Sequence, residues 1–194
     1  MAKPKILAFA GSTREGSFNK KLVKVAIGAV EEAGAEVTYL DLRDLALPLF
    51  DEDLEAREGL PPGGRRLKDL LLAHQGLLVS SPEYNSSISG VLKNAIDWAS
   101  RPAPNEAPLG CFVDKTAALL SASPGALGGL RGLVTLRSIL GNIKVLVLPE
   151  QVTVPKANEA FDASGALKDP KLEASILALG KKLVGVVSKL QQAR

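Results

Sequence analysis

Short runs of hydrophobic residues alternate with longer amphipathic segments along this chain. The runs predict strands near residues 5–10, 36–42, 76–81, 115–121 and 143–148. The amphipathic segments predict helices near residues 18–33, 64–74, 90–100, 129–141 and 170–190. Regular alternation of strands with helices is typical of an α/β fold with a parallel sheet.

The predicted strands differ in how completely apolar they are, and this difference indicates their order. The first and third are almost continuously apolar, as expected of strands that are covered on both faces. Residues 37–42 mix polar and apolar positions, which suits a strand at the edge of the sheet. The pattern favours a doubly wound, flavodoxin-like, five-stranded parallel sheet of order 2-1-3-4-5 with helices on both faces.

Length and composition predict a single α/β domain over residues 1–194. The one cysteine, Cys111, cannot form an internal disulfide, and the one histidine, His74, cannot build a histidine-based metal site. We therefore expect no metal, and redox chemistry would belong to an organic cofactor. Cys111 is expected to be an inert thiol in or beside a loop, and His74 the exposed end of a helix.

Charge and hydropathy predict a cytoplasmic protein that binds neither membranes nor nucleic acid. The N-terminal apolar run of five residues is shorter than the roughly 7 to 15 of a signal peptide, and no stretch approaches the roughly 20 of a membrane span. The net charge of +3 is modest and its basic residues are spread along the chain.

A polar segment follows the first predicted strand and reads Gly-Ser-Thr-Arg-Glu-Gly-Ser-Phe-Asn, residues 11–19. The N–H groups at the start of the next helix would face an anion, and Arg14 adds a permanently charged, forked donor. The segment therefore predicts a phosphate site. An ordinary strand-to-helix turn with Ser17 or Asn19 as N-cap is the alternative.

This segment differs from two better-known nucleotide motifs. Ser17 follows Gly16 where a P-loop has lysine, which argues against a nucleoside triphosphatase. Residues 11–13 lack the second glycine that lets the backbone approach a pyrophosphate. One phosphate suits the segment better than two.

A second polar loop, residues 82–90, follows the third predicted strand. Ligands of doubly wound sheets bind beyond the carboxyl ends of the strands, where both polar segments are expected. Tyr84 and Asn85 supply a planar aromatic ring and an amide that could face a flat heterocycle. A surface loop punctuated by Pro82 is the alternative.

Together, these segments resemble the NADPH-dependent FMN reductase family, which includes quinone, azo-dye and chromate reductases. The resemblance rests on Gly-Ser-x-Arg-x-x-Ser-x-Asn at 11–19, Ser-Pro-Glu-Tyr-Asn at 81–85 and Gly-x-Leu-Lys-Asn-Ala-Ile-Asp-Trp at 90–98. It covers nearly the whole chain, and the paired motifs in this order are specific.

The resemblance implies bound FMN and three groups of cofactor-binding residues. Those implied around the phosphate are Ser12, Arg14, Ser17, Phe18 and Asn19. Those implied at the isoalloxazine edge are Pro82, Glu83, Tyr84 and Asn85. A third segment, residues 121–129, would touch the other side of the flavin through Ser123 and Gly125. Ala122 stands where several relatives carry a hydroxyl group.

The implied activity is a two-step exchange on one flavin face. NADPH or NADH delivers hydride to N5 of FMN and leaves, and a quinone or another small acceptor (an azo dye, a metal oxyanion or free flavin) then takes the electrons. The cofactor supplies this chemistry, so no side chain is expected to be catalytic. Glu83 suits backbone contact to the flavin edge, and a solvated carboxylate is its alternative. Relatives are dimers or tetramers, which implies a homo-oligomer.

Two other classes of protein share this strand order. A flavodoxin-type electron carrier binds FMN without turning over a small substrate, but such carriers usually lack the arginine and are acidic, whereas this chain is mildly basic. A signalling receiver domain needs an acidic pair after the first strand, where this chain has Gly11 and Ser12. The reductase is favoured over both.

Two connections, residues 43–63 and 101–114, are longer than usual. The acidic run at 51–53 requires no more than a short solvated helix, although the connection could bracket the flavin of a neighbouring subunit. Trp98 fits either the core or a subunit interface.

Overall fold

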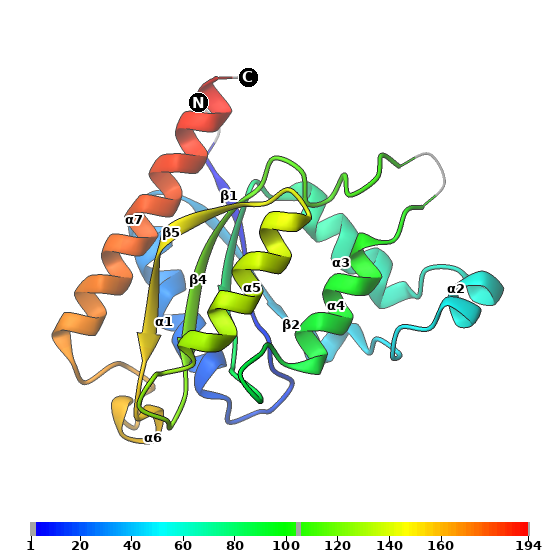
Figure 1. Cartoon of the computed structure of the whole chain (residues 1–194). Helices are drawn as coiled ribbons and strands as arrows, with labels where there is room; N and C mark the ends of the chain where they lie inside the picture. Colours follow the sequence, from blue (N-terminus) through cyan, green and yellow to red (C-terminus); the bar gives the residue numbers. More distant parts are fainter. Residues whose placement is uncertain (1–2, 104–105, 194) are drawn as a thin grey trace.

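The computed structural model describes residues 3–103 and 106–193, whose strands form one parallel sheet of order β2-β1-β3-β4-β5 (Figure 1). The strands are β1 (Lys5–Ala10), β2 (Glu36–Asp41), β3 (Gly76–Ser80), β4 (Thr116–Ala122) and β5 (Leu146–Val154). The predicted α/β class and order are confirmed. Because the order reverses between β1 and β3, the loops after these strands diverge and leave a crevice at the carboxyl edge.

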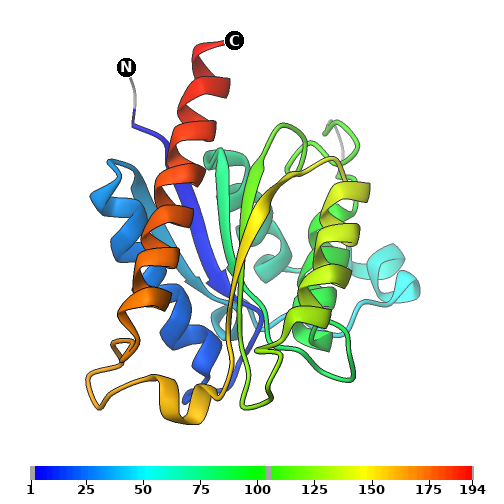
Figure 2. The ribbon, with the colours of Figure 1, turned by 60° about the vertical axis from the view of Figure 1, so that its left-hand side comes forward.

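Helices cover both faces of the sheet, as Figures 1 and 2 show. One face is covered by α1 (Phe18–Glu32) and α7 (Pro170–Gln192), and the other by α3 (Pro62–Ala73), α4 (Gly90–Ser100) and α5 (Leu130–Asn142). All five were predicted, with ends within two residues. The short elements are η1 (Leu42–Leu45), α2 (Glu52–Glu58) and α6 (Ala157–Ala160).

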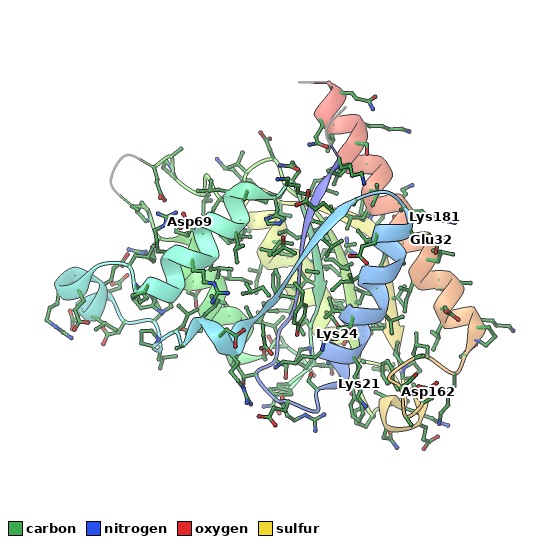
Figure 3. All side chains as sticks on the ribbon, turned by 180° about the vertical axis from the view of Figure 1, so that it is seen from behind. Lys21, Lys24, Glu32, Asp69, Asp162 and Lys181 are labelled. Carbon is green, nitrogen blue, oxygen red and sulfur yellow. The ribbon has the colours of Figure 1, made fainter. Side chains whose placement is uncertain are left out.

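The core lies in two apolar layers, one on each side of the sheet. Alternation along β1 sends Ile6 and Ala8 into the layer under α1 and α7, and Leu7 and Phe9 into the opposite layer. Figure 3 shows α1 and α7 side by side from behind, with the exposed Lys21, Lys24 and Lys181 on these helices. These layers hold β1 and β3 rigidly below the crevice.

The last strand differs from its prediction, which placed it near residues 143–148. The chain is still leaving α5 at 143–145, where Lys144 has a φ of 72°. The strand then continues through Pro149 to Val154, because an edge strand with a register shift opposite Ala117 and Leu119 tolerates proline. Arg137 donates to the Leu148 carbonyl at 2.6 Å and thereby supports this irregular stretch.

The first long connection is fastened to α4. Trp98 is fully buried, and its indole Nε1 donates to the Pro48 carbonyl at 2.8 Å. The Phe50 ring packs edge-on against the indole, with centroids 5.0 Å apart. Trp98 is therefore a core residue, and α2, which buries none of its residues, is the solvated short helix that was expected. In the second connection, Pro104 lies outside the described residues.

His74 is buried, so its prediction as an exposed helix end is wrong. Only 5% of the residue is exposed, and its ring nitrogens lie 2.6 Å from the Leu70 carbonyl and 2.8 Å from the Thr38 hydroxyl. The side chain is covered because strand β2 runs beside the end of α3.

Cys111 lies in a turn, as its expected place in or beside a loop implied, and its side chain is buried. Its Sγ donates to the Ala99 carbonyl at 3.3 Å, and burial raises the pKa of the thiol, which disfavours the reactive thiolate. None of the helices in the described part of the chain is long and apolar enough to cross a membrane.

Candidate functional site

Three loops meet at the carboxyl edge of the sheet and enclose a cleft of about 230 Å³. They are the first loop (residues 11–17), the second loop (81–89) and the third loop (123–129). The cleft is lined by Ser12, Arg14, Ser17, Phe18, Asn19, Pro82, Glu83, Tyr84, Ala122, Ser123 and Pro124. Of the nominated residues, Asn85 and Gly125 do not line it, whereas Ala122 and Pro124 line it without having been nominated.

The first loop ends at the amino terminus of α1. Ser17 caps the helix, and its hydroxyl accepts from the Lys20 N–H at 3.4 Å. The N–H groups of Phe18 and Asn19 belong to the first turn and have no intrahelical acceptor, nor do the described residues supply another. With the nearly buried hydroxyls of Ser12 and Ser17, they form a donor set suited to one anion.

Arg14 adds an unpaired positive charge to this donor set. Its Nη2 donates to the Gly16 carbonyl at 2.7 Å, and its guanidinium carbon lies 5.3 Å from the centre of the Phe18 ring. Phe18 in turn stacks on Phe161. No carboxylate among the described residues forms an ion pair with Arg14. Its charge is therefore available to a ligand.

The side chain of Asn19 is committed to the protein rather than free in the cleft. Its Nδ2 donates to the Ala122 carbonyl, while its Oδ1 accepts from the Ala122 N–H and the Ser80 hydroxyl, each at 2.9 Å. The residue is only 3% exposed. The amide thus fastens the start of α1 to the ends of β3 and β4.

The second loop folds into a tight turn. Tyr84 and Ser87 exchange backbone hydrogen bonds, and positive φ angles of 51° at Asn85 and 64° at Ser86 give a type I′ geometry. The turn leaves Tyr84 57% exposed in the cleft wall and carries Asn85 at its tip, outside the lining. Ser89 donates to the Gly11 carbonyl at 2.5 Å and so joins the second loop to the first.

The third loop is held against the end of β5. The Ser123 N–H donates to the Val154 carbonyl, and its carbonyl accepts from the Ala157 N–H, both at 3.1 Å. Gly125 donates to the Ser123 hydroxyl at 3.3 Å, which shapes the loop although Gly125 is outside the lining. These bonds keep Ser123 and Pro124 at the cleft.

An ionic brace supports the first loop from the edge strand β2. Lys20 lies 2.5 Å from Asp41, and Lys20 and Arg43 both donate to the Thr13 carbonyl. Burial by itself would raise the pKa of Asp41, but hydrogen bonds from Lys20 and the Arg43 N–H and the charges of both residues outweigh it and lower the pKa. The Asp41 carboxylate therefore stays ionised at neutral pH.

The strand order and the cleft together show the general type of this protein. The chain is a doubly wound α/β protein with a cleft at the reversal of strand order, where Arg14 and the first N–H groups of α1 could contact an anionic group. Comparison with known proteins identifies the family, because residues 4–159 match the NADPH-dependent FMN reductase family. The chain belongs to this family. It is an oxidoreductase with FMN as cofactor and NAD(P)H as co-substrate.

Individual relatives agree with this assignment. The chain is 42% identical over 168 residues to an NAD(P)H-dependent FMN reductase of Pseudomonas aeruginosa, covering 86% of each chain. It is 35% identical over 192 residues to a probable NADPH:quinone oxidoreductase of Oryza sativa, covering 96% of this chain and 90% of the relative. The solved flavoenzyme FerB, an NAD(P)H:(acceptor) oxidoreductase from Paracoccus denitrificans, superposes with a TM-score of 0.78 at 29% identity, covering 96% and 98% of the two chains.

The ion pair between Lys20 and Asp41 predicts how the stability of the protein depends on pH. Asp41→Asn is expected to lower the free energy of unfolding at neutral pH, because Lys20 loses its charged partner. A folded-state pKa below the unfolded one makes this contribution complete above about pH 4, and it is lost as the pH falls through the lowered pKa. Urea unfolding at about pH 7 and about pH 3 should show the difference between wild type and variant shrinking in acid.

The matched control is Asp69→Asn on the surface of α3 (Figure 3), which removes an exposed pair with Arg65. It should change stability little at either pH. A wild-type advantage over Asp41→Asn that persists or grows in acid would contradict the brace.

Proposed function

We propose that the cleft holds FMN with its phosphate at the amino terminus of α1. The observation that carries this is the coincidence of the unpaired Arg14 charge with two hydroxyls, on Ser12 and Ser17, and with free N–H groups of the first helical turn. A phosphate dianion matches this donor set in charge and in hydrogen-bonding capacity. Asn19 acts through its backbone, because its amide is engaged with Ala122 and Ser80.

The ring would lie between the second and third loops. Pro82, Glu83 and Tyr84 line one side of the cleft, and Ala122, Ser123 and Pro124 line the other. Asn85 and Gly125 would act by shaping these loops, since neither lines the cleft. Both loops are tied to strand ends, so they present their backbone groups in fixed positions.

Bound FMN supplies the redox chemistry, accepting a hydride from NAD(P)H and passing electrons to a second substrate. The residues of this chain bind and orient. None of the cleft-lining residues is a histidine, lysine, cysteine or aspartate, and the single lining glutamate, Glu83, is paired with Arg131. Protons for the reduced acceptor can come from water.

We propose a quinone as the acceptor class. The names of several relatives, including those from Oryza sativa, Solanum tuberosum and Pseudomonas putida, state quinone reduction. Azo dyes, metal oxyanions and free flavin are further small acceptors that an open cleft would admit. An electron carrier, the alternative, would need a protein donor in place of NAD(P)H.

We further propose that the chain acts as a homo-oligomer in the cytoplasm. The start of α5 and the loop before it expose Leu127, Leu130 and Val134, at 50%, 39% and 62%. Their spacing places the two helical residues on one face, beside the third loop. A second copy could cover these apolar side chains. A purely monomeric boundary in sedimentation velocity would contradict this proposal.

The reductase proposal predicts turnover with small substrates alone. FMN-saturated protein should oxidise NADPH or NADH rapidly with a simple benzoquinone, and initial rates should give the parallel double-reciprocal lines of a ping-pong mechanism. Protein stripped of flavin is the control and should regain activity on adding FMN. Slow nicotinamide oxidation that neither FMN nor quinone accelerates would contradict the proposal and favour the electron carrier.

A further inference from the structure

Helix α5 begins without a capping side chain of its own. Its N-cap position is Gly129, whose φ of 90° is left-handed and which has no side-chain acceptor. The N–H groups of the first helical turn need acceptors from elsewhere. They find one in the second loop, where Glu83 Oε2 accepts from the N–H of Arg131 at 3.0 Å and of Gly132 at 3.3 Å. These are the second and third helical positions, the ones that a normal N-cap side chain serves.

The other oxygen of the same carboxylate binds the Arg131 side chain. Glu83 Oε1 accepts from Arg131 Nε at 2.8 Å and lies 2.7 Å from Nη2, a two-pronged contact. The Glu83 side chain is only 9% exposed, whereas that of Arg131 is 60% exposed. The carboxylate is therefore neither solvated nor free to act as a base.

Gly132 lets the second loop approach the helix this closely, and Gly129 lets the start of α5 lie against Ser121 of β4. A Cβ at residue 132 would lie 3.1 Å from the Ser87 carbonyl oxygen and 3.2 Å from both the Cα and the Cβ of Glu83. A Cβ at residue 129 would lie 1.9 Å from the Ser121 hydroxyl oxygen and 3.6 Å from the Glu83 Cβ. The close approach at Gly132 places Glu83 where its carboxylate reaches the N–H groups of α5.

We propose that Glu83 is a positioning residue for the flavin ring, acting by capping α5 from the second loop. This inference rests on the proposed placement of FMN, in which Pro82 and Tyr84, the sequence neighbours of Glu83, lie beside the flavin ring. The carboxylate fixes the second loop to α5, which begins where the third loop ends, so it sets the spacing of the two loops around the ring. Among the described residues, no hydrogen bond or ion pair links Glu83 to the phosphate donors of the first loop.

Because Glu83 supports the ring contacts and the first loop provides the phosphate contacts, a substitution of Glu83 should have a specific effect on binding. Glu83→Ala frees the second loop from α5, so it should weaken the ring contacts and leave the phosphate contacts intact. The dissociation constants of FMN and of riboflavin, which lacks the phosphate, should then rise by the same factor, roughly 3- to 10-fold. Glu83→Gln keeps an oxygen acceptor for the two N–H groups and should restore part of the affinity. Arg131→Ala keeps both backbone bonds and should have the smallest effect.

Flavin fluorescence titrations of the flavin-free protein with each ligand test this, with Glu150→Gln as the matched control. Glu150 forms an exposed pair with Lys182 and is not among the residues that line the cleft, so both constants should be unchanged. Amide hydrogen exchange of flavin-free protein gives a second readout, since Arg131 and Gly132 should exchange faster in Glu83→Ala than in wild type. If Glu83→Ala does not fold, Glu83→Gln serves for both measurements.

Two results would overturn the inference. One is a Glu83 variant that loses thermal stability while both affinities stay unchanged, which would make the cap merely structural. The other is a loss of FMN affinity with riboflavin unaffected, which would connect Glu83 to the phosphate. Failure of wild-type protein to bind FMN would instead contradict the proposed function, while the exchange rates of Arg131 and Gly132 would still test the cap.

Discussion

The site depends on one buried side chain, the amide of Asn19. It makes three hydrogen bonds, to both backbone groups of Ala122 and to the Ser80 hydroxyl, and so joins the first turn of α1 to the ends of two neighbouring strands. Leaving such groups buried without partners costs about 1–3 kcal/mol each, so the three elements are held in one arrangement. Because α1 is fixed in this way, its free N–H groups and the second and third loops line the same cleft.

Charge is distributed around the cleft so that one cation stays available. Lys20 and Arg43 are engaged with Asp41, Glu15 and the Thr13 carbonyl, and they support the first loop from outside. Arg131 is engaged with Glu83 at the start of α5. Of Arg14, Arg43 and Arg131, only Arg14 has no carboxylate partner in the described part of the chain. The basic residues that shape the loops are therefore neutralised, and the electrostatic attraction for an anion is concentrated at the start of α1.

Local patterns predicted the sheet order and placed two polar segments at its carboxyl edge, whereas the family resemblance supplied most of the residues expected around the ligand. Continuous apolar runs distinguish covered strands from an edge, and a polar segment after a strand lies at the carboxyl edge whatever else the chain does. The features that local patterns could not predict depend on contacts between segments far apart in the sequence. His74 is buried by β2, Glu83 caps a helix that begins 47 residues later at Leu130, and strand β5 runs through Pro149 because it is an edge. Asn85 and Gly125 were nominated from the family resemblance, yet they lie outside the lining of the cleft and shape its loops.

Arg14 is proposed to bind the phosphate of FMN, and comparing FMN with riboflavin binding in wild type and Arg14→Ala tests this role most directly. Losing a charge-assisted hydrogen bond of roughly 1.5 to 3 kcal/mol should weaken FMN binding by about 10- to 150-fold. Riboflavin binding should stay unchanged, as should both affinities in the control Arg57→Ala, whose side chain is exposed on α2 and pairs only loosely with Glu58. An FMN dissociation constant that is the same in wild type and Arg14→Ala would contradict the account.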